Sequence, residues 1–191
     1  MNPTITLVGT APLLMHGTGL ADPISDDAKR MKRISAKRVK TDEDHIAMRR
    51  IEFESGLYLD PEAGPFLPGP NIAKALLNAA KIRRQGPKIE RGLILVSPVN
   101  PLQYDGPRDV SGLWNAPRFR HVVPAKLNGK ATVMRCRPIF AEWSCTATAL
   151  INPSVLSIEE LAEIASDAGQ MIGVGDWRPW HGRFEATVRA A

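Results

Sequence analysis

The order of strand and helix patterns constrains the fold of this 191-residue chain more than any other feature. Its last part predicts paired strands, then a helix over 158–171 between Ser157 and Gly173, and then a strand over 183–188. Ser157 is a favoured N-cap, and glycine commonly follows a helix. Paired strands followed by a helix and a strand make half of a ferredoxin-like sheet, the split βαβ arrangement. We therefore expect an α+β fold, in which an antiparallel sheet carries its helices on one face.

The clearest turn lies at Asn128-Gly129, between two strand patterns. Both residues tolerate the positive φ angles of a tight hairpin turn. We expect a β-hairpin over about 118–137 that projects from the sheet. Its second strand is expected to continue through a bend at Pro138 as far as Ile151.

Two helix patterns lie in the N-terminal third of the chain. The first runs from Asp22, as its cap, to Lys40, and the second follows Thr41, another favoured N-cap. We expect the pair to form a helical insertion over about 20–55, within a single domain of residues 1–191.

The remaining patterns complete the expected sheet and its helices. Residues 4–9 alternate as a strand, and the apolar run 93–96 predicts a buried strand. Residues 60–64 predict the turn of a small hairpin. A helix is expected over 71–84, with Asn71 as its cap.

Composition narrows the class of protein only mildly. The formal net charge is +5, a modest excess that favours polyanionic partners without requiring them. Cys136 and Cys145 lie in strand patterns, where buried free thiols are common, although a disulfide stays open. The N-terminus does not resemble a signal peptide, and no run approaches the ~20 apolar residues of a membrane helix. We expect an intracellular protein without a membrane partner.

Three segments carry cations that could contact phosphates. The first is a run without internal acidic residues, whose candidates are Lys29, Arg30, Lys32, Arg33, Lys37 and Arg38. The expected hairpin supplies Arg118, Arg120, Lys126, Lys130, Arg135 and Arg137. Lys74 lies one turn into a helix whose N-terminus could bind an anion. The alternatives are a solvated helix face neutralised by nearby acids, an ordinary two-stranded ribbon, and plain helix capping.

The stretch 173–184 concentrates glycine, aromatic and cationic residues. Glycines allow a close approach to the backbone, while indole and guanidinium groups stack on bases or bind phosphates. The candidates for nucleic-acid binding here are Trp177, Arg178, Trp180, His181 and Arg183. In the alternative interpretation both tryptophans anchor the core, and Arg183 pairs with Glu185 on the surface.

The residue pattern gives little support to catalysis. The four histidines are scattered, and the spacings HxxxH, HExxH, CxxC and GxSxG do not occur. We expect no catalytic residue, no metal site and no cofactor.

Three segments also occur in an order and spacing found in a known family. Ala11–Gly19, with its Pro-Leu and Gly-x-Gly, follows the first strand; Phe66–Leu76 places Pro-Gly before a helix; and Gly173–Phe184 forms a glycine-rich loop before the last strand. Together they resemble the RAMP superfamily, the RRM-like backbone proteins of CRISPR effector complexes. Pro70-Asn71 and Ala75 depart from that family's Ser-Ser and second Gly. The ending Gly-Asp-Trp-Arg-Pro…Gly-Arg-Phe also resembles small proteins of tailed bacteriophages.

The resemblance implies an RRM-like domain that binds RNA or single-stranded DNA along its sheet and a thumb-like hairpin. It also implies head-to-tail assembly into a homo-oligomer or filament. The expected function is therefore non-catalytic binding of single-stranded nucleic acid by a phage-encoded protein in the bacterial cytoplasm. Two alternatives stay open: a structural or assembly protein of a phage virion, and an inhibitor that mimics a CRISPR backbone subunit.

Overall fold

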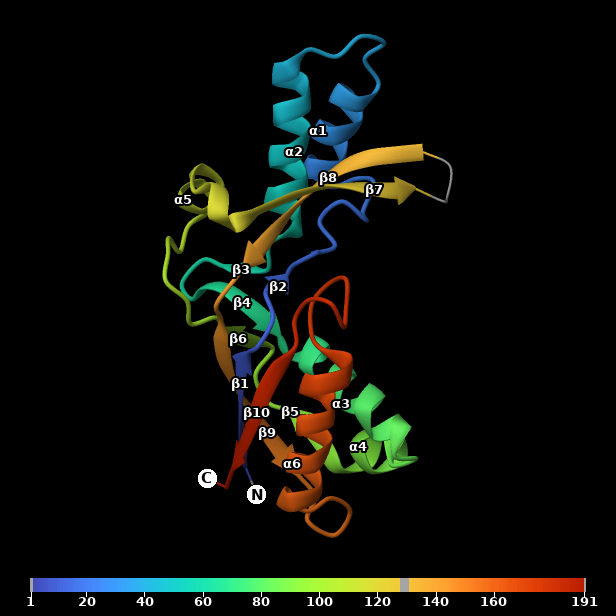
Figure 1. The fold of residues 1–191 in the computed structure, drawn as a ribbon, viewed down its shortest axis with the longest axis vertical. Helices are drawn as coiled ribbons and strands as arrows, with labels where there is room; N and C mark the ends of the chain where they lie inside the picture. The colour runs from blue at the N-terminus through green and yellow to red at the C-terminus, as the bar shows by residue number, and fades with distance from the viewer. Residues whose placement is uncertain (1, 128–130, 191) are drawn as a thin grey trace. The chain divides into compact units, whose positions relative to one another are not determined.

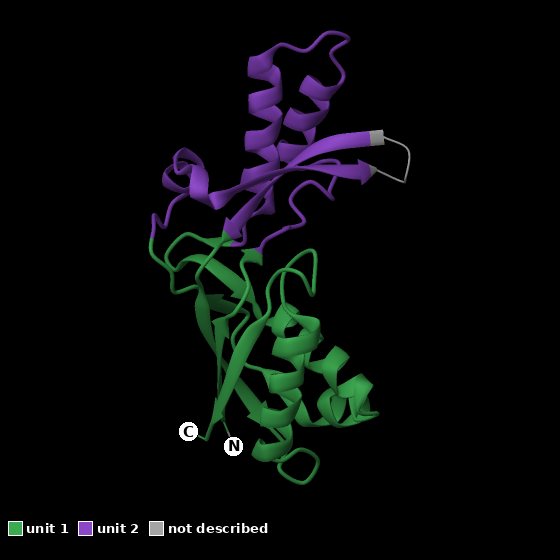
Figure 2. Ribbon diagram, viewed as in Figure 1, with its two compact units in different colours: residues 1–13, 59–105, 140–191 green, residues 14–58, 106–139 purple. Residues whose placement is uncertain are grey.

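The chain forms two compact units of mixed α and β structure (Figure 2). The structure, a computed structural model, describes residues 2–127 and 131–190. Unit 1 comprises residues 1–13, 59–105 and 140–191, and unit 2 comprises residues 14–58 and 106–139.

The helical insertion expected at about 20–55 and the hairpin expected at about 118–137 both fall in unit 2. Two regions that are distant in the sequence therefore belong to one compact body. The predicted Asn128-Gly129 turn and the candidate Lys130 lie outside the described residues.

Unit 1 is built on a four-stranded antiparallel sheet with the strand order β10-β1-β9-β5 (Figure 1). These strands are β1 Thr4–Gly9, β5 Leu93–Leu95, β9 Ser144–Ile151 and β10 Phe184–Arg189. The central strands bury alternate residues, such as Ile5 on β1 and Ala147 on β9. This period of two marks a sheet with one face on the core, so the antiparallel α+β prediction is confirmed.

Three helices of unit 1 lie beside this sheet: α3 Gly69–Ile82, α4 Gly86–Gly92 and α6 Ile158–Asp167 (Figure 1). Helix α6 packs against β10 and against α3. The predicted cap is confirmed, because the Ser157 hydroxyl accepts from the Glu160 N–H while the Glu160 carboxylate accepts from the Ser157 N–H. The last turn of the predicted helix, η2 Ala168–Ile172, widens to π geometry and ends at Gly173.

A second small sheet of unit 1 has the order β3-β4-β6. Its strands are β3 Leu59–Asp60, β4 Gly64–Pro68 and β6 Val99–Pro101. Strands β3 and β4 confirm the small hairpin predicted around 60–64, whose turn is closed by Asp60 accepting from the Glu62 and Ala63 N–H groups. These two bonds hold the pKa of the Asp60 carboxyl below its usual value.

The long strand predicted to run to Ile151 is wrong. Strand β8 (Ala131–Phe140) ends at Phe140, and β9 begins at Ser144. Between them Trp143 turns inward, where its indole N–H donates to the Ala11 carbonyl at 2.9 Å. The buried ring thus lies in the break between the two strands, and sequence alternation alone does not reveal that break.

Two smaller predictions in unit 1 are also wrong. Strand β5 is not buried, since Ile94 is 63% exposed. The strand lies at the edge of the sheet and has a neighbouring strand on one side only. Asn71 does not cap α3, which begins earlier, at Gly69, with Pro68 in the N-cap position and no side-chain cap bond. Pro70 lies within the first turn of α3, where an N–H has no intrahelical partner to lose.

Unit 2 contains a helical hairpin and a β-hairpin (Figure 1). Its elements are α1 Asp26–Ser35, α2 Asp42–Gly56, α5 Val110–Asn115, the 3-10 turn η1 Pro117–Phe119, strand β7 Arg120–Leu127 and β8 up to residue 139. The short strand β2 (Leu13–Leu14) falls at the boundary of the two units, and the strand order is β2-β8-β7. Phe53 of α2 is fully buried and meets the Trp114 ring edge-on, with centroids 5.5 Å apart. Aromatic contacts of this kind add to the apolar burial that holds the unit together.

The caps of the helical hairpin are predicted correctly at one helix and wrongly at the other. Thr41 caps α2 in a capping box with Asp44, as expected. Helix α1 is shorter than the predicted 22–40 and is capped by Ser25 instead of Asp22. The Asp22 carboxylate accepts from the Ile24 N–H, so it closes a turn ahead of the helix.

Both cysteines are free and buried, Cys136 in unit 2 and Cys145 in unit 1. Burial raises the pKa of the Cys136 thiol to about 11 and that of the Cys145 thiol to about 12. A raised pKa keeps a thiol neutral and unreactive as the pH rises.

We expect both cysteines to react with iodoacetamide at pH 8 at least about a hundredfold more slowly in the native protein than in urea, as measured by mass spectrometry. Labelling of either native cysteine at the unfolded rate would contradict this burial.

Candidate nucleic-acid interface

The loop over 173–183 links η2 to β10 in unit 1 and is fixed at its base by backbone bonds. The Val174 N–H donates to the Gly182 carbonyl at 2.9 Å, and the Gly182 N–H donates to the Pro12 carbonyl at 2.8 Å. The Val174 side chain is fully buried. Gly173, Gly175 and Gly182 all have φ between 70° and 80°, a region that favours glycine. The base of the loop is thus part of the core.

The tip of this loop faces solvent. Trp180 is 82% exposed and Trp177 is 37% exposed, so the interpretation of both tryptophans as core anchors is wrong. Val174 supplies the anchor instead. Trp177 has φ 51°, which is rare for a residue with a side chain, and its ring meets the His181 ring edge-on at 6.0 Å. Strain of this type is concentrated at binding and catalytic sites.

Two hollows flank the exposed rings. The larger, about 450 Å³, is lined by Asn78, Met171, Ile172, Gly175, Asp176, Trp177, Arg178 and Pro179. The smaller, about 180 Å³, is lined by Gln170, Met171, Pro179, Trp180 and Arg183. The structure therefore gathers four of the five predicted residues of this stretch around shared hollows. Flat rings, guanidinium groups and an amide are groups that bind bases and phosphates.

Sequence reasoning missed Met171 and Asn78 at this site. The sequence pattern places Met171 in the last turn of a helix and does not indicate that its side chain faces the solvent. In the structure Met171 is 64% exposed. Asn78 lies on α3, far from the loop in sequence. No local signal marks either residue, because the packing of α3 near η2 brings them to the loop.

Arg183 and His181 differ in their surroundings. Arg183 is exposed and forms no ion pair within the described residues, so the pair with Glu185 offered by the alternative interpretation is not formed. Its carbonyl accepts from the Thr10 N–H at 2.9 Å, which continues the β1–β10 pairing into the loop. His181 is half-buried, and its backbone N–H donates to the Trp177 carbonyl at 3.2 Å.

The open face of the four-stranded sheet has a different character. The outward residues of the central strands, all of them described, are Thr4, Thr6 and Val8 on β1 and Ser144, Thr146, Thr148 and Leu150 on β9. The Thr6 and Thr146 hydroxyls lie 3.1 Å apart. RRM domains stack bases on aromatic rings at these strands. The described residues of these strands contribute no outward aromatic side chain, but Tyr104 and Trp143 line a hollow of about 440 Å³ beside Val8 and Ser144.

The predicted anion site at the start of α3 is not supported by its surroundings. The Gly69 N–H already donates to the Pro98 carbonyl at 3.0 Å. The adjoining hollow of about 290 Å³ is lined by Gly69, Pro70, Ala73, Leu95, Val96, Ser97 and Pro98, a set without Lys74. Lys74 itself is exposed one turn further along the helix.

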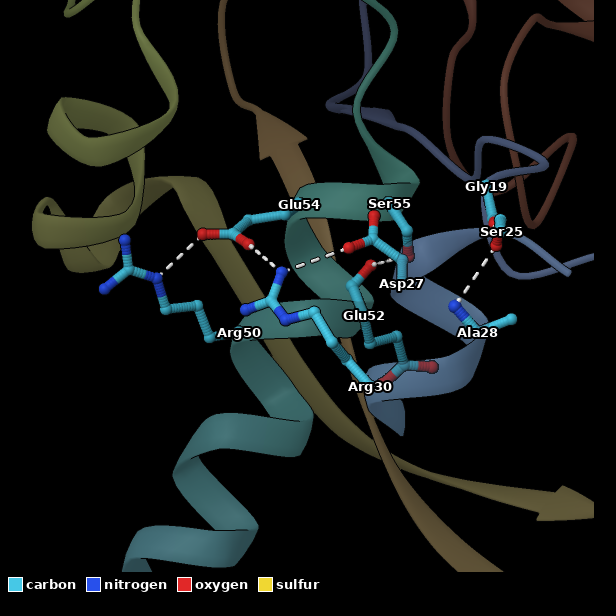
Figure 3. A network of polar contacts seen from close by, with 9 residues as sticks. All are labelled: Gly19, Ser25, Asp27, Ala28, Arg30, Arg50, Glu52, Glu54 and Ser55. Carbon is cyan, nitrogen blue, oxygen red and sulfur yellow. Dashed lines mark hydrogen bonds and ion pairs between the residues drawn. The ribbon is translucent and has the colours of Figure 1, made fainter. Parts of the chain in front are cut away.

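The basic run of unit 2 is only partly neutralised. Figure 3 shows Arg30 of α1 between Asp27 and Glu54, with Arg50 on the far side of Glu54. Lys37 pairs with Asp44 at 2.6 Å and holds the pKa of that carboxyl below its usual value. The remaining candidates are exposed and form no ion pair within the described residues: Lys29, Lys32, Arg33 and Arg38. Lys37 and Arg38 lie beyond the end of α1, in the connection to α2.

The cations of the β-hairpin divide into surface and internal groups. Arg118 and Lys126 are exposed, and Arg120 lies over the Trp114 ring at 4.9 Å. Arg135 instead reaches the buried Glu52 of α2, with Nη1 2.9 Å from Oε1. Arg137 is only 9% exposed, and its Nε lies 3.3 Å from His16 Nδ1. Their contacts place Arg135 and Arg137 within the packing of unit 2.

Within residues 2–127 and 131–190, no helix is long and apolar enough to cross a membrane. In the same part of the chain, no three His, Cys, Asp or Glu side chains gather into a potential metal site. Comparison with known protein families and with curated protein sequences finds no match for this chain.

Proposed function

We propose that this protein binds single-stranded RNA or DNA without catalysis and assembles with itself head-to-tail along that ligand. The observation that carries the proposal is the exposed Trp180 on a loop whose base is built into the core. An exposed indole offers a flat ring on which nucleobases can stack. Arg178 and Arg183 beside the same hollows would bind the phosphates.

The surface cations of unit 2 support the same ligand. Lys29, Lys32, Arg33 and Arg38 are exposed and are not held by carboxylates within the described residues. Cations of this kind release counterions when they meet phosphates, which makes binding salt-dependent. We leave Arg137 out of the proposed surface because it is buried, and Arg135 because Glu52 already neutralises its one-third exposed side chain.

We further propose a ferredoxin-like fold for unit 1 and membership of the RAMP superfamily. The strand order β10-β1-β9-β5, with α3 between β1 and β5 in the chain and α6 between β9 and β10, supports the split βαβ arrangement. Of the resembling segments, Phe66–Leu76 spans β4 and α3, and Gly173–Phe184 leads into β10. A phage-encoded protein of the host cytoplasm is part of this proposal.

A direct test measures the anisotropy of labelled oligonucleotides of one sequence as single-stranded RNA, single-stranded DNA and duplex. We expect micromolar or tighter binding of a single strand at about 50 mM salt, and a linear fall of log K with log salt. Duplex should bind more weakly, because its bases cannot stack on the indoles. Absence of single-strand binding at low salt would refute the proposal and would favour a protein interface, where Trp and Arg are also enriched.

Trp180→Ala should weaken single-strand binding by about 1–3 kcal/mol, the value of one base stacked on an aromatic ring. The variant should stay folded, because the ring is 82% exposed in the free protein. Leu150→Ala, which truncates an exposed apolar residue on the open sheet face, is the matched control and should bind normally. Equal affinity of the two variants, measured by the same titration, would remove Trp180 from the site.

A further inference from the structure

The two edges of the four-stranded sheet are unequally protected. Strand β5 has three residues, and the chain leaves that edge at Pro98 after the Val96 N–H donates to the Thr148 carbonyl. Strand β10 has six residues and contains no proline. Proline and short length are common ways to block an edge from pairing with another chain. The edge of β10 has neither.

The backbone groups on the free edge of β10 follow from the hydrogen bonds on its other side. The Arg183 carbonyl accepts from Thr10, so Arg183 is directed toward β1. In an antiparallel strand the backbone N–H and C=O groups of every second residue point to the same neighbour. The backbone groups of Glu185, Thr187 and Arg189 therefore point toward β1. Gly9 lies opposite Phe184 on β1, and its N–H donates to the Trp143 carbonyl on the side away from β10. Gly9 and Phe184 are therefore not hydrogen-bonded to each other, which agrees with this alternation.

The N–H and C=O groups of Phe184, Ala186 and Val188 therefore point away from β1. A Cβ on Gly169 of η2 would overlap the Phe184 carbonyl oxygen, so that end of the edge is covered. The groups of Ala186 and Val188 have no strand beside them within the described residues, because β10 is the outer strand. They form a short row of donors and acceptors with which no strand of the described residues pairs.

The exposed side chains of β10 make this edge complementary to itself. Glu185, Thr187 and Arg189 are exposed on one face of the strand. If two copies of β10 pair antiparallel about Thr187, Glu185 of each copy lies opposite Arg189 of the other. In the same register Ala186 lies opposite Val188, and both point their backbone groups across the new interface. The direction of the backbone hydrogen-bonding groups and the pattern of charged side chains thus favour the same register, the one centred on Thr187.

We propose that β10 is a self-association edge, at which a second copy of this chain adds its own β10 antiparallel about Thr187. A neighbouring register about Ala186 would place Arg189 opposite Arg183, and like charges directly opposite destabilise a strand pair. The contact uses the same surface on both copies, so it closes at a dimer. It is therefore independent of the head-to-tail contact proposed above and of nucleic-acid binding.

The test is sedimentation equilibrium of nuclease-treated protein up to about 100 µM, a range suited to a small edge interface. We expect a monomer–dimer equilibrium in the wild type. Glu185→Arg places arginine opposite Arg189 at both ends of the interface, and Arg189→Glu places two carboxylates opposite each other. Each variant should raise the dimer Kd by about tenfold or more.

Complementary variants separate this register from a loss of folding. The mixture of Glu185→Arg with Arg189→Glu should form heterodimers of wild-type strength, and the double variant with both changes should dimerise again. Glu90→Arg and Arg91→Glu on α4 reverse the same charges elsewhere in unit 1 and should dimerise normally. A monomeric wild type, single variants that dimerise as well as wild type, or a mixture that stays monomeric would each overturn the proposal.

Discussion

Gly182→Ala is expected to lower the free energy of unfolding by about 3 kcal/mol or more, because a methyl group there has no room and the backbone angle disfavours it. Gly182 has φ 70°, and a Cβ would overlap the Val174 carbonyl oxygen. That oxygen cannot easily move, since Val174 is fully buried and its N–H is bonded to the Gly182 carbonyl. Urea unfolding followed by circular dichroism measures the loss.

The neighbouring Arg183→Ala is the control for Gly182→Ala. Arg183 is exposed and forms no ion pair within the described residues. The free energy of unfolding of Arg183→Ala should therefore differ from that of the wild type by less than about 0.5 kcal/mol. Gly182→Ala should also lose oligonucleotide affinity, because the loop that carries Trp180 would no longer be anchored. Wild-type stability of Gly182→Ala would show that the base of the loop is not part of the core.

Glu52→Gln is expected to destabilise the protein by about 2 kcal/mol, since it removes the charge of a buried carboxylate and leaves one buried donor without an acceptor. The Glu52 side chain is 7% exposed. One of its oxygens accepts from Arg135 at 2.9 Å, and the other accepts from the Cys136 N–H at 2.8 Å. A glutamine can offer only one acceptor oxygen, so either Arg135 or the Cys136 N–H would face an NH₂ group. The same urea titration gives the change.

Glu54→Gln provides the matched control two residues along α2. Glu54 lies between Arg50 and Arg30 (Figure 3), at 2.7 Å and 3.8 Å. Those arginine side chains are about half exposed. Exposed ion pairs contribute little, so this change should cost less than about 1 kcal/mol. If both variants lose the same stability, the burial of Glu52 is not what makes its pair important.

Much of the fold follows from local signals. The caps at Thr41 and Ser157 and the first and last strands, 4–9 and 183–188, correspond closely to elements of the structure. Such features depend on residues a few positions apart, so sequence patterns can locate them. Errors arose where a distant contact decides the local conformation, as at Trp143, whose burial ends one strand before the next begins.

The candidate site was predicted only in part for the same reason. The stretch 173–184 is conspicuous in the sequence, but whether its tryptophans face the core or the solvent depends on what packs beneath them. The carboxylate of Glu52 that captures Arg135 lies 83 positions away in the sequence. No pattern of basic residues reveals which cations are internal, because the partners come from another element.

The sequence by itself determined the α+β class, the capped helices and the glycine-rich aromatic loop, because each depends on spacing along the chain. Only the tertiary structure decided that Trp180 is exposed, that Arg135 and Arg137 serve the packing of unit 2, and that β10 is an outer strand. Exposure, ion pairing and strand order depend on contacts between residues far apart in the chain. Those contacts are fixed by burial and hydrogen bonding together, and local propensity does not encode them.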